Sequence, residues 1–286
     1  MIDNTVAYSG LTMGMGTIYR VGNIAGLIDM PDIRSADRVR LRRHGDLAGD
    51  DFAGQRDIEV SILVDGTALD GPTYTAAMDA LLTATRPGRA EMALTFRIPG
   101  VAGGGDRQVL ARPRKRTIPL EPERYGIAQA PEVTVLFTAT DPRIYDAALQ
   151  TGTSTLPTAG GGLTFNVTPN LVFGAVSTGG SIFALNAGTF PTSPTFRIDG
   201  PVTNPRIENL TSGLTLSLNI TLGVGDFLLI DSEARTILLG GTASRYSSLA
   251  VGSSWFSLDP GTSEVRFRAT TPTAAQLTMS WRSAWL

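Results

Sequence analysis

Apolar and polar residues alternate along most of the second half of the chain, and this two-residue period limits the fold more than any other feature of the sequence. In GLTLSLNITLGVGDF, apolar residues alternate with polar ones, the apolar set being Leu214, Leu216, Leu218, Ile220 and Leu222. Successive side chains of a β-strand point to opposite faces, so this run predicts a strand with one buried face. Similar short runs follow, separated by turn-forming residues and by no helical pattern. We therefore predict an antiparallel β-sandwich for this half.

The closing stretch QLTMSWRSAWL keeps the same period. Its apolar side carries Leu277, Met279, Trp281 and Trp285, together with Ser283. The pattern predicts a last strand of the same sandwich with both tryptophans in its core. The alternative is an aromatic platform for a sugar or a partner protein.

The first half mixes strands with one helix. The run RVRLRR predicts a strand with Val39 and Leu41 on one side and Arg38, Arg40 and Arg42 on the other. Three arginines on one strand face present planar forks that suit carboxylates on a neighbouring subunit. We therefore take them as candidate interface residues, the alternative being a solvated strand face.

Helical spacing of apolar residues occurs once, in DGPTYTAAMDALLTATRPG, and predicts a helix near residues 72–86. The stretches DIEVSILVDG, AEMALTFRIPG and PEVTVLFTAT alternate as strands do. Residues 1–148 are therefore predicted to form a β-sandwich with one α-helix. The charge-free segment 149–162, LQTGTSTLPTAGGG, is the predicted linker, and 163–286 the C-terminal sandwich. The fold class is mainly β, in two domains.

Composition excludes several classes of site and partner. The 286 residues include no cysteine and carry a net charge of −2. Disulfides, thiolate catalysis and zinc–thiolate sites are excluded, and no basic excess favours nucleic acid. The start has no basic segment followed by an apolar one, and no apolar run reaches the roughly 20 residues that span a bilayer. We expect a protein that folds in the cytoplasm and has no membrane partner.

Residues suited to catalysis are few. His44 stands in RRHGDLAGDD without a motif that links it to a nucleophile. Asp226, Asp231 and Glu233 lie in GDFLLIDSEARTILLGG, which reads as strand, turn and strand. Acids at a hairpin turn are usually solvated. We therefore predict no enzyme, and no catalytic, cofactor-binding or metal site. Trp255 and Phe256 are kept as a candidate aromatic binding surface.

A resemblance to a known family covers most of the chain. In the second half it rests on Gly200-Pro201, Asn204-Pro205, Gly225-Asp226 and Arg235-Thr236-Ile237, followed by SSWFSLDPGTSEVRFRAT. In the first half it rests on GDDFAGQRDIEVSILVDG and TATDPRIYD. Together these pieces resemble the distal tail proteins of phages with long non-contractile tails, with a galectin-like C-terminal domain.

The resemblance implies a structural role at the virion tail tip. Such proteins form a ring of six subunits, built by the N-terminal domains, from which the C-terminal sandwich projects. The ring joins the tail tube to the tail-associated hub and leaves a channel for DNA and the tape-measure protein. The competing hypothesis is a carbohydrate-binding module that recognises the host cell wall. An enzyme acting on the cell wall is a third, for which the sequence offers only the acids of a hairpin turn.

Overall fold

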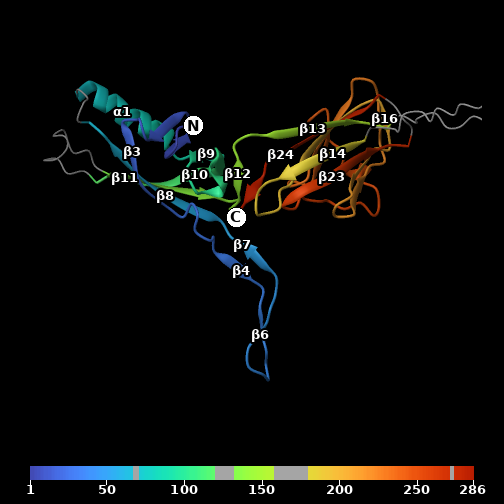
Figure 1. Cartoon of the computed structure of the whole chain (residues 1–286), viewed down its shortest axis with the longest axis horizontal. Helices are drawn as coiled ribbons and strands as arrows, with labels where there is room; N and C mark the ends of the chain where they lie inside the picture. Colours follow the sequence, from blue (N-terminus) through green and yellow to red (C-terminus); the bar gives the residue numbers. More distant parts are fainter. Residues whose placement is uncertain (67–70, 120–131, 158–179, 271–273) are drawn as a thin grey trace, which may run out of the picture. The chain divides into compact units, whose positions relative to one another are not determined.

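The chain folds into two compact units. The computed structural model describes residues 1–66, 71–119, 132–157, 180–270 and 274–286. Unit 1 comprises Met1–Ala147 together with Trp285–Leu286, and unit 2 comprises Ala148–Ala284 (Figure 1). The chain therefore passes from one unit to the other twice.

Unit 1 is built on a sheet with the strand order β2-β1-β9-β10-β11-β8-β3, in which all neighbours are antiparallel. The strand β10, Arg107–Thr117, is long enough to serve two parts of this sheet: its first half pairs with β9 and its second half with β11. The other strands are β1 (Thr5–Tyr8), β2 (Leu11–Gly14), β3 (Tyr19–Ala25), β8 (Arg56–Val64), β9 (Met92–Arg97), β11 (Glu132–Ala139), and β12 (Ile144–Asp146), which pairs with β10 and β25.

The core of unit 1 follows the alternation of its strands. In β8 the buried residues are Ile58, Val60, Ile62 and Val64, while the residues between them face outward. The helix α1, Gly71–Ala84, lies close to the predicted range and buries Ala77, Met78 and Leu81 in the same core. A short 3₁₀ turn, η1, spans Ala102–Gly104. No helix in the described residues is long and apolar enough to cross a membrane.

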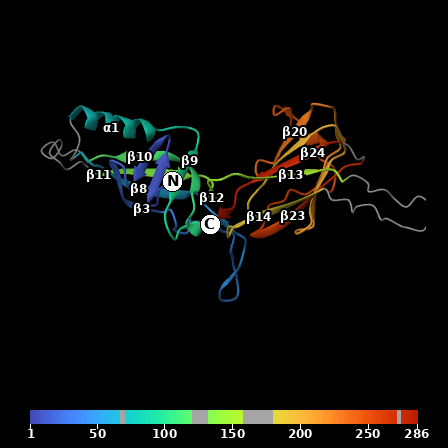
Figure 2. The same ribbon diagram turned by 45° about the horizontal axis from the view of Figure 1, so that its top comes forward.

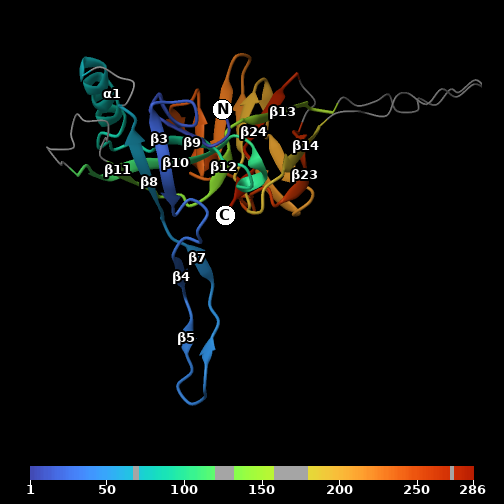
Figure 3. The same cartoon turned by 60° about the vertical axis from the view of Figure 1, so that its left-hand side comes forward.

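A long hairpin leaves the sheet of unit 1 between β3 and β8, and we call residues 33–53 the arm. Its legs pair first as β4 (Ile33–Ser35) with β7 (Asp51–Ala53) and then as β5 (Arg38–Val39) with β6 (Asp46–Leu47). Figure 3 shows β4, β5 and β7 extending away from the sheet that contains β3 and β8. The strand predicted for RVRLRR is thus only two residues long, because the chain turns at 41–45.

Unit 2 is a sandwich of two main antiparallel sheets. Figure 2 shows β13, β20 and β24 in one layer and β14 and β23 in the other. The six-stranded sheet has the order β13-β24-β15-β20-β21-β22, and the four-stranded sheet β14-β23-β17-β18. Their bounds are β13 (Gln150–Thr155), β14 (Ser181–Asn186), β15 (Thr195–Asp199), β17 (Arg206–Asn209), β18 (Leu214–Ser217), β20 (Phe227–Asp231), β21 (Thr236–Leu239), β22 (Ala243–Ser244), β23 (Gly261–Arg268) and β24 (Gln276–Trp281). A small pair, β16 (Val202–Thr203) with β19 (Thr221–Leu222), and the turn η2 (Tyr246–Ser248) complete the unit.

The run GLTLSLNITLGVGDF, predicted as one strand, is broken in two. Leu216, Leu218 and Leu222 are buried as expected, whereas Leu214 is exposed. The chain forms β18, makes a single bridge at Leu218 and then joins a different partner strand as β19. Alternation is kept through the break, because the same face stays in the core of the sandwich.

Two further sequence predictions need correction. Residues 150–155 of the predicted linker form β13, which pairs with β24 along its whole length, and residues 158–162 lie outside the described residues. The closing stretch is not one strand: β24 ends at Trp281 and is followed by β25, Ala284–Trp285. Trp281 is buried in the core of unit 2, but Trp285 packs against the core of unit 1. The two indole side chains lie in different cores because the strand is interrupted at residues 282–283, so that Trp281 and Trp285 no longer share one face of a single strand.

Candidate assembly surface

The arm is the most exposed ordered element of unit 1. Along its legs the side chains of Ile33, Leu47 and Phe52 are open to solvent, and at its far end Val39 is 76% exposed and Leu41 is 96% exposed. The alternation predicted a strand with Val39 and Leu41 on one side; both side chains are exposed, because no other element of the described chain covers the arm. Apolar side chains held in solvent on a projecting element make the arm a candidate for contact with a partner.

The three candidate arginines lie near the end of the arm. Arg38 is in β5, Arg40 follows it directly and Arg42 is in the turn, and all three are exposed. None of them forms an ion pair within the described parts of the chain. The structure therefore brings the three residues together on one element, with their guanidinium groups free to meet an acidic partner.

The root of the arm is held by Arg56, which sequence reasoning did not single out. Arg56 is 2% exposed, and its Nη1 donates hydrogen bonds to the carbonyl oxygens of Gly26, Leu27 and Asp29 at 2.7–3.0 Å. Its Nε donates to the carbonyl oxygen of Pro142 at 2.7 Å. Burial lowers the pKa of the Arg56 guanidinium, and the nearby Asp29 opposes this shift. Four carbonyl groups thus fix the point where the chain enters the arm.

Two glycines allow the legs of the arm to approach each other. A Cβ on Gly49 would collide with the carbonyl oxygen of Ala36, and one on Gly54 would lie 2.8 Å from the carbonyl oxygen of Asp32. Backbone hydrogen bonds join the legs at these points: Gly54 N donates to Asp32 O at 2.6 Å, and Ala36 N donates to Asp50 O at 3.2 Å. Glycine at these two positions is therefore a requirement of the closely paired hairpin.

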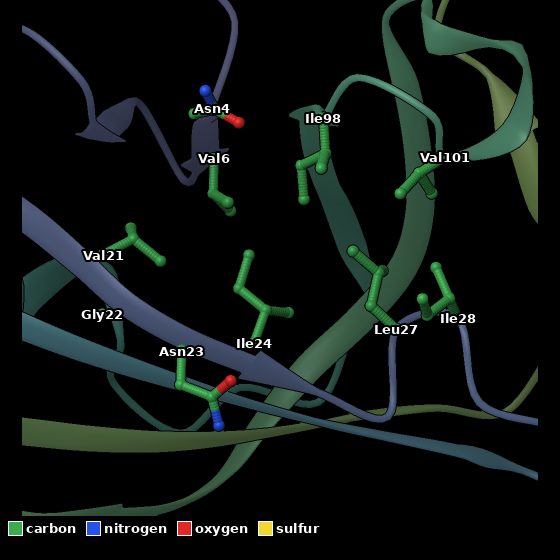
Figure 4. A pocket seen from close by; sticks show the side chains of 10 residues that line it. All are labelled: Asn4, Val6, Val21, Gly22, Asn23, Ile24, Leu27, Ile28, Ile98 and Val101. Atoms are coloured by element: carbon green, nitrogen blue, oxygen red, sulfur yellow. The ribbon is translucent and has the colours of Figure 1, made fainter.

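An apolar pocket of about 300 Å³ lies in unit 1 between β3, the start of β1 and the end of β9 (Figure 4). Figure 4 shows Val6, Val21, Ile24 and Ile98 around it, with Leu27 and Val101 at one side. The polar side chains of its lining are those of Asn4 and Asn23. The lining has no acid, base or nucleophile, so the pocket has no group for acid–base or covalent catalysis.

Most of the candidate aromatic surface in unit 2 belongs to the core of the sandwich. Phe256 is buried and packs edge-on against Phe196, with ring centroids 5.7 Å apart. Trp255 is partly buried and packs against the same core, so part of its ring remains open to solvent.

The polar residues considered for catalysis also have structural surroundings. His44 is exposed in the turn of the arm. The carboxylate of Asp231 accepts hydrogen bonds from the backbone N–H groups of Glu233 and Ala234 at 2.9 and 2.8 Å, and that of Asp226 from Gly223 at 2.9 Å. These acids therefore close turns. Among the described residues, no group of three or more His, Asp or Glu side chains could hold a metal ion.

Comparison with known proteins agrees with this architecture. Residues 187–285 match the family described as the siphovirus-type tail component, C-terminal domain. No curated protein matches the chain in sequence. Among solved structures, the chain is similar to the SPP1 Dit protein, with 16% identity, a TM-score of 0.66 and 99% of both chains covered. SPP1 Dit is described there as a paradigm of the hub adsorption apparatus in phages that infect Gram-positive bacteria.

A second similar structure is a chain of the phage P2 baseplate in its activated conformation, with 13% identity, a TM-score of 0.50 and 98% of both chains covered. At these identities the structures show a shared fold, which is mainly β with one helix, as the sequence predicted. Residues 187–285 are thus similar to the C-terminal domain of the siphovirus-type tail components, and the chain has, over almost its whole length, the fold of SPP1 Dit.

Proposed function

We propose that this protein is a structural subunit of a phage tail tip, six copies of which form a ring that joins the tail tube to the tail-associated hub. The observation that carries the proposal is the arm, which holds apolar and arginine side chains in solvent on an element of unit 1. The match of residues 187–285 to a tail component supports the location at the tail tip.

A ring explains the arm better than a monomer does. An isolated two-stranded hairpin is marginally stable in water, so an arm of this length needs a partner surface. Contacts between different surfaces of identical subunits close into a ring when the rotation between neighbours allows it. The channel of such a ring passes DNA and the tape-measure protein, and a net charge of −2 avoids the strong phosphate attraction of a basic protein.

The role proposed is not enzymatic. The carboxylates considered for catalysis close turns, and the apolar pocket of unit 1 lacks titratable side chains. The glycan-binding alternative named Trp255 and Phe256; Phe256 is buried and Trp255 is partly buried in the same core, which weakens that alternative. We therefore propose that the protein acts through protein surfaces.

The mass of the purified protein in solution tests the ring. One chain is 30.2 kDa, so six copies are 181.2 kDa. Native mass spectrometry at that mass, together with a central hole in negative-stain images, is the expected result. A protein that stays at 30.2 kDa even when mixed with its tail-tube and hub partners would overturn the proposal.

A further inference from the structure

The far end of the arm carries a net positive charge, and none of its arginines forms an ion pair within the described parts of the chain. Residues 37–46 contain the four arginines of RVRLRR and two acids, Asp37 and Asp46. The side chains that alternate with Arg38 and Arg40 are exposed as well, so the whole end of the hairpin faces solvent. A partner for this element must therefore present carboxylates on an open surface.

Such a surface exists on the sheet of unit 1. On the outer side of β8, Asp57 and Glu59 are exposed and alternate with the buried core residues of the strand. Glu59 has no ion pair in the described part of the chain, and Asp57 accepts a hydrogen bond from the hydroxyl of Thr138 at 2.6 Å. Next to them on the same face, Leu63 is exposed. The face thus combines two carboxylates with apolar surface, as the arm combines arginines with apolar side chains.

We propose that the arm of one copy lies on the outer face of β8 of a second copy, with Arg38 and Arg40 paired to Asp57 and Glu59. This inference rests on the proposed ring and names the surface that its arm contacts. Both pairs are two residues apart in extended chain, where such side chains share a face at a spacing of about 6.6 Å. Two matched guanidinium–carboxylate pairs fix both the direction and the register of the contact.

The partner carboxylates belong to another copy, because an arm cannot reach its own. Asp57 follows directly on Arg56, which is bound at the root of the arm. Arg40 lies seven residues beyond Ile33, which is about 23 Å of extended chain. Figure 3 shows the arm pointing away from the sheet that carries β8. A donor and an acceptor at distant positions of one subunit form a head-to-tail contact, which is the type that builds rings.

Cross-linking tests the contact directly, since the chain contains no cysteine of its own. A tagged Arg40→Cys chain is mixed with an untagged Glu59→Cys chain and treated with a short bis-maleimide, because an Arg–Glu pair separates the Cα atoms beyond the roughly 4.4–6.8 Å of a disulfide. The matched control acceptor is Glu132→Cys, an exposed carboxylate of β11 that lies opposite Leu63 on the same face. We expect several-fold more mixed dimer with Glu59→Cys than with Glu132→Cys. Equal yields would overturn the proposal.

Charge exchange separates this contact from the ring itself. Arg40→Glu and Glu59→Arg should each weaken self-association on the order of tenfold, since each places like charges together. The two changes combined in one chain should restore it, and Glu132→Arg should leave it unchanged. Both sites are exposed, so circular dichroism should show normal folding in each variant. A ring that forms despite either single change leaves the proposed function standing and refutes this contact. Cross-linking and rescue without a particle of six subunits would support the contact and refute the ring.

Discussion

Replacing Trp285 by alanine should destabilise unit 1, although the residue stands at the end of the sequence of unit 2. The Trp285 ring packs against the core of unit 1, and the guanidinium of Arg107 lies 4.2 Å from its centroid. Removing a fully buried tryptophan costs about 3–5 kcal/mol. A partly buried ring loses less by burial, but the cation–π contact adds about 1 kcal/mol. We expect a loss of about 3 kcal/mol, or about 6–12 °C in the unfolding temperature of a unit of this size.

Trp281→Ala is the matched control. Trp281 lies four residues earlier, is buried in the core of unit 2, and its Nε1 donates a hydrogen bond to the carbonyl oxygen of Leu185 at 2.9 Å. Calorimetry gives the size of each loss, and hydrogen exchange read by mass spectrometry shows which unit opens. Trp285→Ala should lower protection in β9 and β10, and Trp281→Ala in β15 and β24. If both variants loosen the same unit, the assignment of the two rings to different cores is refuted.

Three further predictions concern single positions. Arg56→Met leaves four carbonyl groups, one buried and three partly buried, without their donor. It should cost about 3 kcal/mol, with faster exchange at residues 26–29, as measured by urea unfolding and hydrogen exchange. Gly49→Ala places a methyl group against the carbonyl oxygen of Ala36. Hydrogen exchange of the Ala36 N–H should therefore become faster, while the unfolding of the sheet in unit 1 stays unchanged. An Ala36 N–H that stays protected from exchange would contradict this. The hydrogen bond from Arg97 holds the pKa of Asp106 below its usual value, so this carboxylate stabilises the fold fully above about pH 4 and progressively less as the pH falls below that. Asp106→Asn should therefore be less stable than the wild type at about pH 5 in urea unfolding, and the difference should shrink progressively as the pH falls below about 4.

The strands could be predicted from the sequence where one face of a sheet is buried. Ile58, Val60, Ile62 and Val64 alternate without interruption and are all buried. This alternation cannot show how far a strand continues with the same partner strand, because the same face stays buried when the chain leaves one partner and pairs with another. For this reason Leu216 and Leu222 were placed correctly in a core, yet they belong to different pairs of strands.

The arm and its root could not be predicted, because their cause is not local. The alternation of Val39 and Leu41 with arginines is the pattern of a half-buried strand, and only the full structure shows that nothing in the described chain covers it. The role of Arg56 depends on carbonyl groups that lie 27–30 and 86 residues away in the sequence. Likewise, the burial of Phe256 depends on the position of Phe196 in another strand.

Because the chain passes between its two units twice, unit 1 can be completed only after unit 2 has been synthesised. Unit 1 is made first, but one of its packing residues, Trp285, follows Ala147 by 138 positions. At a synthesis rate of about 5–20 residues per second, this interval is roughly 7–28 s. During that interval the sheet of unit 1 lacks the indole side chain of Trp285, which packs against Arg107. Unit 1 of a newly made chain therefore reaches its full stability only after the whole of unit 2 has been synthesised, so chains interrupted within unit 2 carry a weakened unit 1.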